Sequence, residues 1–227
     1  MLSLFRVFVI HYSIIHTMPK ILSLNPLNPR PDLISEAARV INNGGIISFP
    51  TRYLYGLGAD ALNSEAVDRV FAIKQRPYSK PLSVLIKHQK DLSLLARNVP
   101  QAAVSIMERF WPGDITIVFE AHAALPSKLT AGTGKIGVRL PQHPVAVALT
   151  NAVQVPITAT SANLTGRGGC SRVADLDPLF ADKLDLMLDA GQLEGGIGTT
   201  VIDVTFDVPK ILREGAVPAK DIFALLD

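Results

Sequence analysis

The stretch that decides the fold is GGIISFPTRYLYGLGADALNSEAVDRVFAIKQRPYSKPLSVLI, residues 44–86. Its residues 46–49 predict a short buried strand, which Pro50 and Thr51 end. The small residues 56–59 predict a flexible run within a loop. Apolar residues then recur at helical spacing, which indicates a helix that begins near Ser64 or Glu65.

Three cations follow this predicted helix. Lys74, Arg76 and Lys80 cluster around two prolines, and residues 82–86 predict another strand. Guanidinium and ammonium donors suit phosphate and carboxylate oxygens, so the cluster is a candidate anion site. The alternative is that these side chains favour the C-terminal end of the helix dipole and face water. Spacing alone leaves both interpretations open.

Working outward, the same alternation of helices and strands continues. Before the opening stretch, the prolines of residues 20–31 predict a loop, and Asp32 predicts the cap of a helix that ends at 42–44. After it we expect helices at 91–97, 101–110, 145–151 and 177–180, and strands at 115–119, 136–140, 156–160, 183–188, 200–204 and 210–213. This alternation predicts one α/β domain with a mixed sheet.

The first seventeen residues, MLSLFRVFVIHYSIIHT, do not fit this pattern. They are apolar but interrupted by an arginine and two histidines, and they are too short to span a bilayer. They also lack the unbroken apolar centre and the small-residue cleavage site of a secretory signal. Because Met18 offers a second start, we expect residues 1–17 to be an extension outside the fold and residues 18–227 to form the domain.

The composition is that of an ordinary folded protein, with 48% hydrophobic and 19% charged residues. A net charge of +2 creates no global basic field, so partners have to be argued from local sites. A single cysteine, Cys170, excludes an internal disulfide and a cysteine metal cluster, which fits a reducing compartment.

Polar groups gather where predicted strands end, and ligands of open α/β sheets bind at such edges. Arg139 follows an apolar strand and either presents its fork to a carboxylate or is an ordinary solvated arginine. Ser161 and Asn163 either hydrogen-bond a phosphate or base or form a turn or helix cap. Arg213 has the same ambiguity, and His143 is interpreted as a loop histidine. The sequence contains no G-x-x-x-x-G-K-[ST] phosphate loop and no paired-histidine zinc spacing.

Taken in order, seven segments resemble the YrdC-like family of threonylcarbamoyl-AMP synthases in its single-domain form. The resemblance runs from about residue 34 to residue 213. The segments are P-T-R-Y-L-Y-G-L (50–57), K-Q-R-P (74–77) with K-P-L (80–82), W-P-G-D-I-T (111–116), V-R-L-P (138–141), T-S-A-N-L-T-G (160–166), T-T-V-I-D (199–203) and L-R-E-G (212–215). Each segment alone is weak, but their ordered set favours a functional role for the basic cluster.

The resemblance implies a twisted, open α/β sheet with a positively lined concave cavity. It also implies a nucleotidyltransferase that combines L-threonine, bicarbonate or CO2, and ATP with Mg2+ into threonylcarbamoyl-AMP and pyrophosphate. A partner transferase of the tRNA-modification machinery would take the product. The expected setting is the cytoplasm, without membrane association. Positioning and charge neutralisation suit this chemistry without a covalent nucleophile.

The resemblance also assigns roles to individual residues. The K-x-R and S-x-N pairs, expected to be catalytic, are Lys74, Arg76, Ser161 and Asn163. The residues expected to hold the nucleotide and its phosphates are Arg76, Lys80, Ser161, Asn163 and Arg213. Arg139 is expected to bind the threonine carboxylate, and the other substrate-binding positions are Thr51, Tyr53 and Thr199.

The chain departs from the family pattern at its first motif. Where the family usually reads P-T-[DE]-T, Arg52 replaces the acid and Tyr53 replaces the second threonine, so Tyr53 either offers its hydroxyl from farther out or occludes the threonine site. Thr199 stands where serine is common. Two alternatives therefore stay open: a paralogue acting on another carbamoyl-adenylate, and a non-catalytic RNA-binding or ribosome-associated protein.

Overall fold

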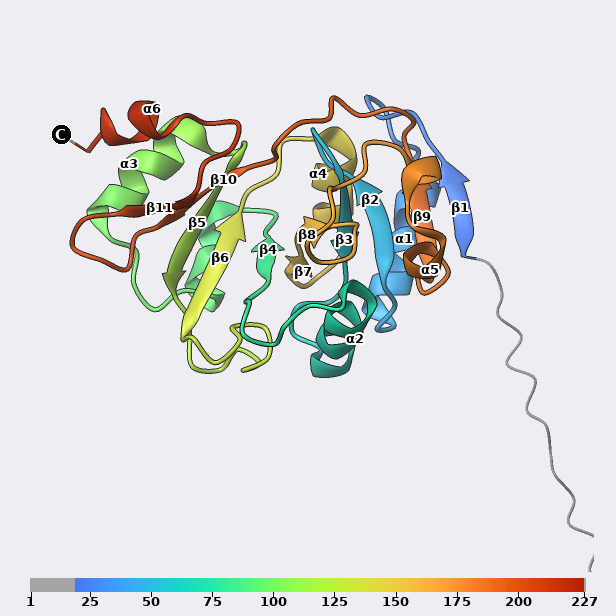
Figure 1. Ribbon diagram of the computed structural model, residues 1–227, viewed down its shortest axis with the longest axis horizontal. Coiled ribbons are helices and arrows are strands. Elements are labelled where there is room, and N and C mark those ends of the chain that lie inside the picture. The colour runs from blue at the N-terminus through green and yellow to red at the C-terminus, as the bar shows by residue number, and fades with distance from the viewer. Residues whose placement is uncertain (1–18, 227) are drawn as a thin grey trace, which may run out of the picture.

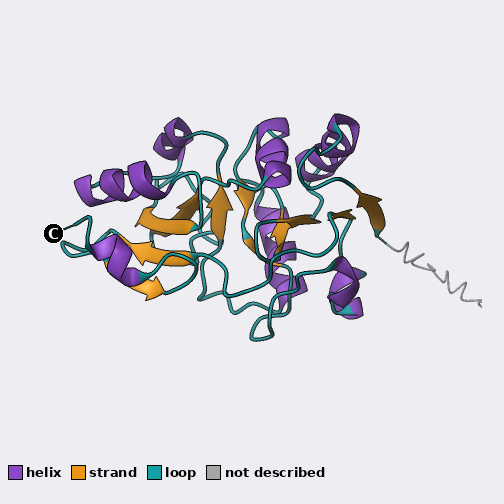
Figure 2. Ribbon diagram, turned by 90° about the horizontal axis from the view of Figure 1, so that it is seen from above, coloured by secondary structure: helices purple, strands orange, loops and turns teal. Residues whose placement is uncertain are grey.

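The computed structural model describes residues 19–226, and these fold as an α/β protein with two sheets side by side. Figure 1 shows the six-stranded sheet on the left and the five-stranded sheet on the right, and Figure 2 shows helices on both sides of the strand layer. The expected α/β class is confirmed, but the strands divide between two mixed sheets where one was expected. The expected extension, residues 1–17, lies outside the described residues.

The five-stranded sheet contains the strand of the opening stretch. Its spatial order is β1 (Lys20–Ser23), β9 (Leu186–Asp189), β2 (Ile47–Pro50), β3 (Tyr55–Gly58) and β8 (Thr160–Ser161). β1, β9 and β2 run parallel, whereas β3 pairs antiparallel with both β2 and β8. The hairpin between β2 and β3 therefore carries residues 51–54 at its turn.

The six-stranded sheet forms the other half of the strand layer. Its order is β11 (Lys210–Arg213), β10 (Thr200–Asp203), β5 (Ile115–Glu120), β6 (Lys135–Arg139), β4 (Ser83–Leu85) and β7 (Ile157–Thr158). Parallel pairs join β10 to β5 and β4 to β6, and the remaining pairs are antiparallel.

β7 and β8 belong to one short segment that pairs with both sheets. β7 pairs with β4, and two residues further on β8 pairs with β3. Between them, the Ala159 amide donates to the Ser83 carbonyl at 2.7 Å, and the Thr158 amide donates to the Ala59 carbonyl at 2.9 Å. Every residue from 157 to 161 is paired with or hydrogen-bonded to one sheet or the other, so this segment joins the two sheets.

Helices cover the strand layer and enclose two apolar cores. They are α1 (Pro31–Asn42), α2 (Ser64–Lys74), α3 (Gln101–Phe110), α4 (Pro144–Ala152), α5 (Pro178–Ala181) and α6 (Ala219–Phe223), with 3-10 turns η1 (Gln89–Leu94) and η2 (Val173–Asp175). α1 and α4 pack against β2 and β9. The other four α-helices contribute to the larger core, which also contains residues of both sheets. None of the helices between residues 19 and 226 is long and apolar enough to cross a membrane.

Most elements with a clear apolar period lie where the sequence predicts them. α3 has the predicted bounds, and α2 begins at Ser64 because the Asn63 side chain accepts from the amides of Glu65 and Ala66. Asp32, predicted as a cap, instead lies in the first turn of α1 and pairs with Arg30, whose backbone is the cap. The short helix expected at 91–97 is the 3-10 turn η1.

Three segments differ from the prediction, and for two of them contacts with distant residues determine the secondary structure. Within the predicted loop at 20–31, residues 20–23 form β1 by pairing with β9. α6 follows the last predicted strand. The predicted flexible run at 56–59 is largely the buried strand β3. A Cβ at Gly58 would lie 2.9 Å from Cε1 of Phe49, so this glycine permits close packing of the ring rather than chain flexibility.

This packing predicts an asymmetry between two glycines. Gly58→Ala should lower the free energy of unfolding by about 1 to 3 kcal/mol, because the added methyl overpacks the site against Phe49. Gly168→Ala is the control, since a Cβ there meets no heavy atom within 4 Å. Urea denaturation of both variants measures the difference, and equal losses would contradict the packing explanation.

Candidate active site

A cavity of about 850 Å3 lies between the two sheets, and its lining includes all ten residues predicted from the sequence. They are Thr51, Tyr53, Lys74, Arg76, Lys80, Arg139, Ser161, Asn163, Thr199 and Arg213. Its size is that of a small-molecule site. Residues more than a hundred positions apart therefore meet in one place.

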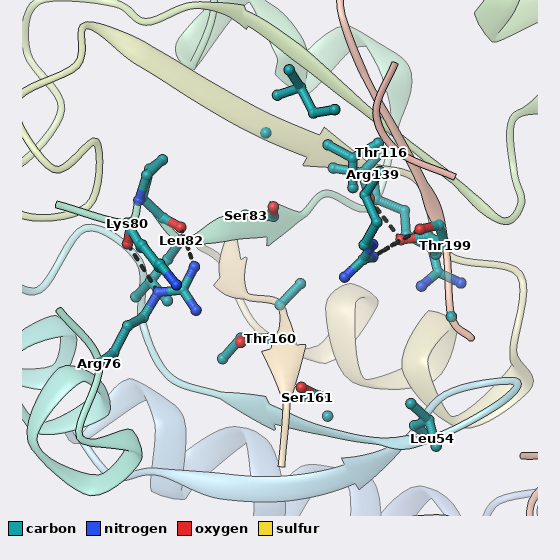
Figure 3. Close-up of a pocket in the computed structure, with 18 of the residues that line it drawn as sticks. Leu54, Arg76, Lys80, Leu82, Ser83, Thr116, Arg139, Thr160, Ser161 and Thr199 are labelled. Atoms are coloured by element: carbon teal, nitrogen blue, oxygen red, sulfur yellow. Dashed lines mark hydrogen bonds between the residues drawn. The ribbon is translucent and has the colours of Figure 1, made fainter. Parts of the chain in front are cut away.

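An arginine lies at each of two ends of the cavity. Figure 3 shows Arg76 and Lys80 on one side, Arg139 and Thr199 on the other, and Ser161 between them. Arg76 and Lys80 belong to the turn after α2. Arg139 ends β6, and Thr199 ends the loop before β10. A ligand with an anionic group at each end fits this spacing of charges better than one with a single anionic group.

Lys74 lines the cavity. The residue is 2% exposed, and Nζ donates to the carbonyls of Ser161 and Asn163. Burial, with a smaller effect of the Arg76 charge, lowers the pKa of Lys74 from 10.5 to about 7. The alternative of a solvated helix-end lysine is therefore wrong for Lys74, which holds the backbone of the S-x-N segment.

Arg76 is held along one edge of its guanidinium. Its Nε donates to the Lys80 carbonyl at 2.9 Å, and Nη2 donates to the Pro81 carbonyl at 2.8 Å. No residue between 19 and 226 accepts a hydrogen bond from Nη1. Because the carbonyls fix the edge formed by Nε and Nη2, the edge of the guanidinium that carries Nη1 remains available to an anion.

Arg139 repeats this arrangement at the other end and is more deeply buried, with 9% of the residue exposed. Its Nε donates to the Gly113 carbonyl at 2.8 Å, and Nη2 donates to Asp114 Oδ1 at 3.0 Å. In the described part of the chain its Nη1 likewise has no acceptor. Of the two roles that the sequence leaves open, the solvated arginine is excluded by this burial.

Asp114 connects Arg139 to the β2–β3 turn. Its carboxylate is 6% exposed, and Oδ2 accepts from Arg52 Nη1 at 3.0 Å, Tyr53 OH at 3.1 Å and Gln142 Nε2 at 2.9 Å. With Arg139 on Oδ1, this carboxylate has four donors from two segments of the chain, residues 52–53 and 139–142. Donors from the protein therefore satisfy the hydrogen-bonding capacity of this carboxylate.

Arg213 and the S-x-N pair complete the lining. Arg213 Nη2 donates to the Thr199 carbonyl at 2.8 Å, and the Thr199 hydroxyl lies 3.2 Å from that of Thr116. Asn163 Nδ2 donates to two backbone carbonyls, whereas its Oδ1 is buried without a partner among the described residues. The hydroxyl of Ser161 faces the cavity in Figure 3.

A family model described as "Telomere recombination", and named for Sua5, YciO and YrdC, matches residues 39–215. The chain belongs to the Sua5/YciO/YrdC family. This membership confirms the resemblance to the YrdC-like family that the ordered motifs carry.

Individual members of the family cover this chain to different extents of their own length. The threonylcarbamoyl-AMP synthase of Pyrococcus abyssi is 37% identical over 186 residues, which are 82% of this chain and 55% of the relative. A crystal structure of P. abyssi Sua5 complexed with L-threonine has a TM-score of 0.84 at 33% identity, covering 91% of this chain and 60% of that one. The crystal structure of Escherichia coli YciO has a TM-score of 0.80 at 29% identity, covering 90% of this chain and 100% of that one. The chain thus spans little more than half the length of the P. abyssi relatives.

Several lining residues of this family member are not among those predicted. Lys135 and Asp203 pair at 2.8 Å, and Asp203 is the one carboxylate in the lining formed by residues 19–226. Asp114 lies outside the lining and accepts from Arg139, Arg52 and Tyr53. The W-P-G-D-I-T motif is the sequence signal that could have identified it. A net positive lining stays a prediction, because Lys74 has a lowered pKa and Lys135 is paired.

The burial of Lys74 predicts a pH dependence of stability. The folded-state pKa of about 7 lies below the unfolded value of 10.5, so unfolding takes up a proton between these two pH values. Stability should therefore rise with pH in this window, by at most about 1.4 kcal/mol per pH unit. Lys74→Met removes the titrating group and should remove this rise.

Urea denaturation at pH 7, 8 and 9 tests the prediction. The wild-type protein should gain stability relative to Lys74→Met as the pH increases. The exposed Lys90, replaced by Met, controls for general effects of pH. A wild-type advantage that is constant across the series would contradict a neutral, buried Lys74.

Proposed function

We propose that the chain is a nucleotidyltransferase that forms threonylcarbamoyl-AMP and pyrophosphate from L-threonine, bicarbonate or CO2, and ATP. The observation that carries this proposal is the pair of arginines, Arg76 and Arg139, at opposite ends of one cavity. Each donates through Nε and Nη2 to the protein, and Nη1 has no acceptor among residues 19–226. Two oriented forks suit a substrate pair with phosphates at one end and a carboxylate at the other.

The names of relatives supply independent support. The P. abyssi relative at 37% identity is a threonylcarbamoyl-AMP synthase, and the P. abyssi Sua5 structure is a complex with L-threonine. Because this chain covers only 55% and 60% of those proteins, their activity and ligand are transferred here as part of the proposal.

The proposed reaction needs no covalent nucleophile. The amine of L-threonine combines with CO2 and loses a proton to form a carbamate. A carbamate oxygen attacks the α-phosphorus of ATP, and the bond to the bridging oxygen breaks as pyrophosphate leaves. The work left to the protein is to hold two anionic substrates together and to neutralise the charge that develops on the phosphates.

The residues divide this work between the two ends of the cavity. Arg76 and Lys80 would neutralise the phosphates at one end, while Ser161 and Asn163 would hydrogen-bond the nucleotide. Arg213 would also hold the phosphates, and because it donates to the Thr199 carbonyl it would reach them from the Arg139 side of the cavity. Lys74 would act on the nucleotide through the carbonyls of Ser161 and Asn163, which it holds. At the other end Arg139 would bind the threonine carboxylate, and the residues around the amino acid would be Thr51, Tyr53 and Thr199.

Magnesium fits this arrangement as a companion of ATP rather than as a resident of the protein. The described lining offers one carboxylate, Asp203, and that group already pairs with Lys135 at 2.8 Å. Magnesium commonly takes few protein ligands and several phosphate or water oxygens. When bound with ATP it would add to the neutralisation of the phosphate charge.

The proposal extends to the fate of the product. A threonylcarbamoyl-adenylate is an activated acyl donor, so a tRNA-modifying transferase would be the partner that consumes it. A cytoplasmic location stays a prediction from the resemblance. The alternative of a non-catalytic RNA-binding protein accounts less well for two forks inside a cavity, because phosphate backbones are bound mainly by exposed basic surfaces.

A paralogue with another carbamoyl-adenylate substrate is a second candidate, and one observation favours it. Tyr53 lies in the cavity lining, with its hydroxyl on Asp114, where the family usually has a threonine. The uncharacterized E. coli protein YciO, at 31% identity, is matched over 96% of its length.

Release of pyrophosphate from Mg-ATP tests the proposed reaction. The assay combines the protein with Mg-ATP and bicarbonate, with and without L-threonine. We expect release only when L-threonine and bicarbonate are both present, because the carbamate is the attacking group. Pyrophosphate release that does not depend on threonine would reject the synthase. Absence of release together with salt-sensitive tRNA binding would also reject it and would favour the RNA-binding alternative.

Arg76→Ala tests the phosphate end of the cavity. We expect kcat/KM to fall by about 100-fold or more, because a preorganised cation at the phosphates is lost. Arg172→Ala is the matched control, since Arg172 pairs with Asp175 outside the cavity. Thermal denaturation checks that both variants stay folded, and unchanged turnover of folded Arg76→Ala would remove this residue from the site.

A further inference from the structure

Two adjacent residues that depart from the family's first motif converge on one buried carboxylate. Arg52 and Tyr53 both donate to Asp114 Oδ2, and the Arg52 guanidinium lies 5.1 Å from the centroid of the Tyr53 ring. A pair of side chains that stack on each other and share one acceptor restrict each other's rotamers. The two replacements therefore act as a unit.

Asp114 passes this constraint to Arg139. Its Oδ1 accepts from Arg139 Nη2, so the position of the carboxylate sets the direction of the fork. The second anchor of the fork is the neighbouring Gly113 carbonyl, on the same turn. The orientation of Arg139 thus depends on a single short segment, and Arg52 and Tyr53 hold that segment from the opposite sheet.

The same two residues also hold the loop that precedes β10. Arg52 Nε pairs with Glu194 at 3.1 Å, and the Gly195 amide donates to the Tyr53 carbonyl at 2.9 Å. This loop carries Ile197, Gly198 and Thr199 into the cavity lining. Its glycines 191, 195, 196 and 198 all have positive φ, so the sequence alone leaves the loop conformation open and outside contacts select it.

We propose that Arg52 and Tyr53 are positioning residues for the amino-acid end of the cavity, acting through Asp114 on Arg139 and through Glu194 on the 191–198 loop. The ligand class is an amino acid with a free α-carboxylate, and naming it rests on the proposed function. Neither residue needs to contact the nucleotide, because Arg76 and Lys80 lie at the far end. The pair should therefore set the affinity for the amino acid and leave that for ATP unchanged.

Binding measured without turnover separates this inference from the proposed function. Isothermal titration calorimetry with the full chain would compare L-threonine, L-threoninamide and Mg-ATP. For Arg52→Ala and Tyr53→Phe we expect the Kd of L-threonine to rise about three- to tenfold, since each variant weakens the hold on one charged acceptor. The amide lacks the carboxylate that Arg139 would bind, so its weaker affinity should be the same in wild type and variants.

Three further variants make the outcome specific. Arg52→Lys keeps a cation and should recover part of the affinity, and Glu194→Gln should show a smaller loss than Arg52→Ala because Asp114 stays paired. Arg30→Ala removes an exposed arginine paired with Asp32, far from the cavity, and should have wild-type affinity.

The binding measurements distinguish a positioning role from a merely structural one. Equal losses for L-threonine and its amide, or a parallel loss for Mg-ATP, would mean a merely structural role and would overturn the inference. The inference also fails if wild-type protein binds no amino acid, or if Tyr53→Phe and Arg52→Ala bind L-threonine normally. If the wild-type protein binds L-threonine and the variants have the expected effects, but no pyrophosphate is released, the synthase activity is rejected. The positioning role of Arg52 and Tyr53 is then still supported.

Discussion

The cavity exists because one backbone segment is shared by two sheets. Residues 157–161 pair with β4 on one side and with β3 on the other, so this segment joins the two sheets. The buried Lys74 side chain donates to the carbonyl of Ser161, the last residue of this segment, and to that of Asn163. A buried amine beside two carbonyls is tolerated because both acceptors are satisfied and the charge is readily lost. Breaking this joint would displace Ser161 and Asn163 together.

Both ends of the cavity use the same device to orient a cation. Arg76 and Arg139 each use Nε and Nη2 on oxygens of the protein and leave Nη1 without an acceptor among residues 19–226. Such an arrangement fixes the rotamer before a ligand arrives, which reduces the entropy lost on binding. It also explains why short turns that carry carbonyls, at 80–81 and at 113, flank the two arginines.

Periodicity predicts most of the helices and strands, and its failures have physical causes. α3 has the predicted bounds because its apolar spacing is complete and a proline precedes it. Residues 56–58 are predicted as part of a flexible run because glycine favours loops, yet their place beside Phe49 requires the absence of a side chain. β1 is not predicted because only its partner, β9, makes residues 20–23 a strand. Propensity is local, whereas strand pairing is not.

The sequence by itself determined the α/β class, through the alternation of helical and strand periods, and the family and ten of the lining residues, through motifs in a fixed order. Residue types at fixed spacing can be recognised without coordinates. Only the tertiary structure decided what those residues do to one another. It buried Lys74 against two carbonyls, and it brought Arg52 and Tyr53 onto Asp114, 61 or more positions away. Hydrogen bonds over such separations depend on how two sheets pack, and no local pattern encodes that packing.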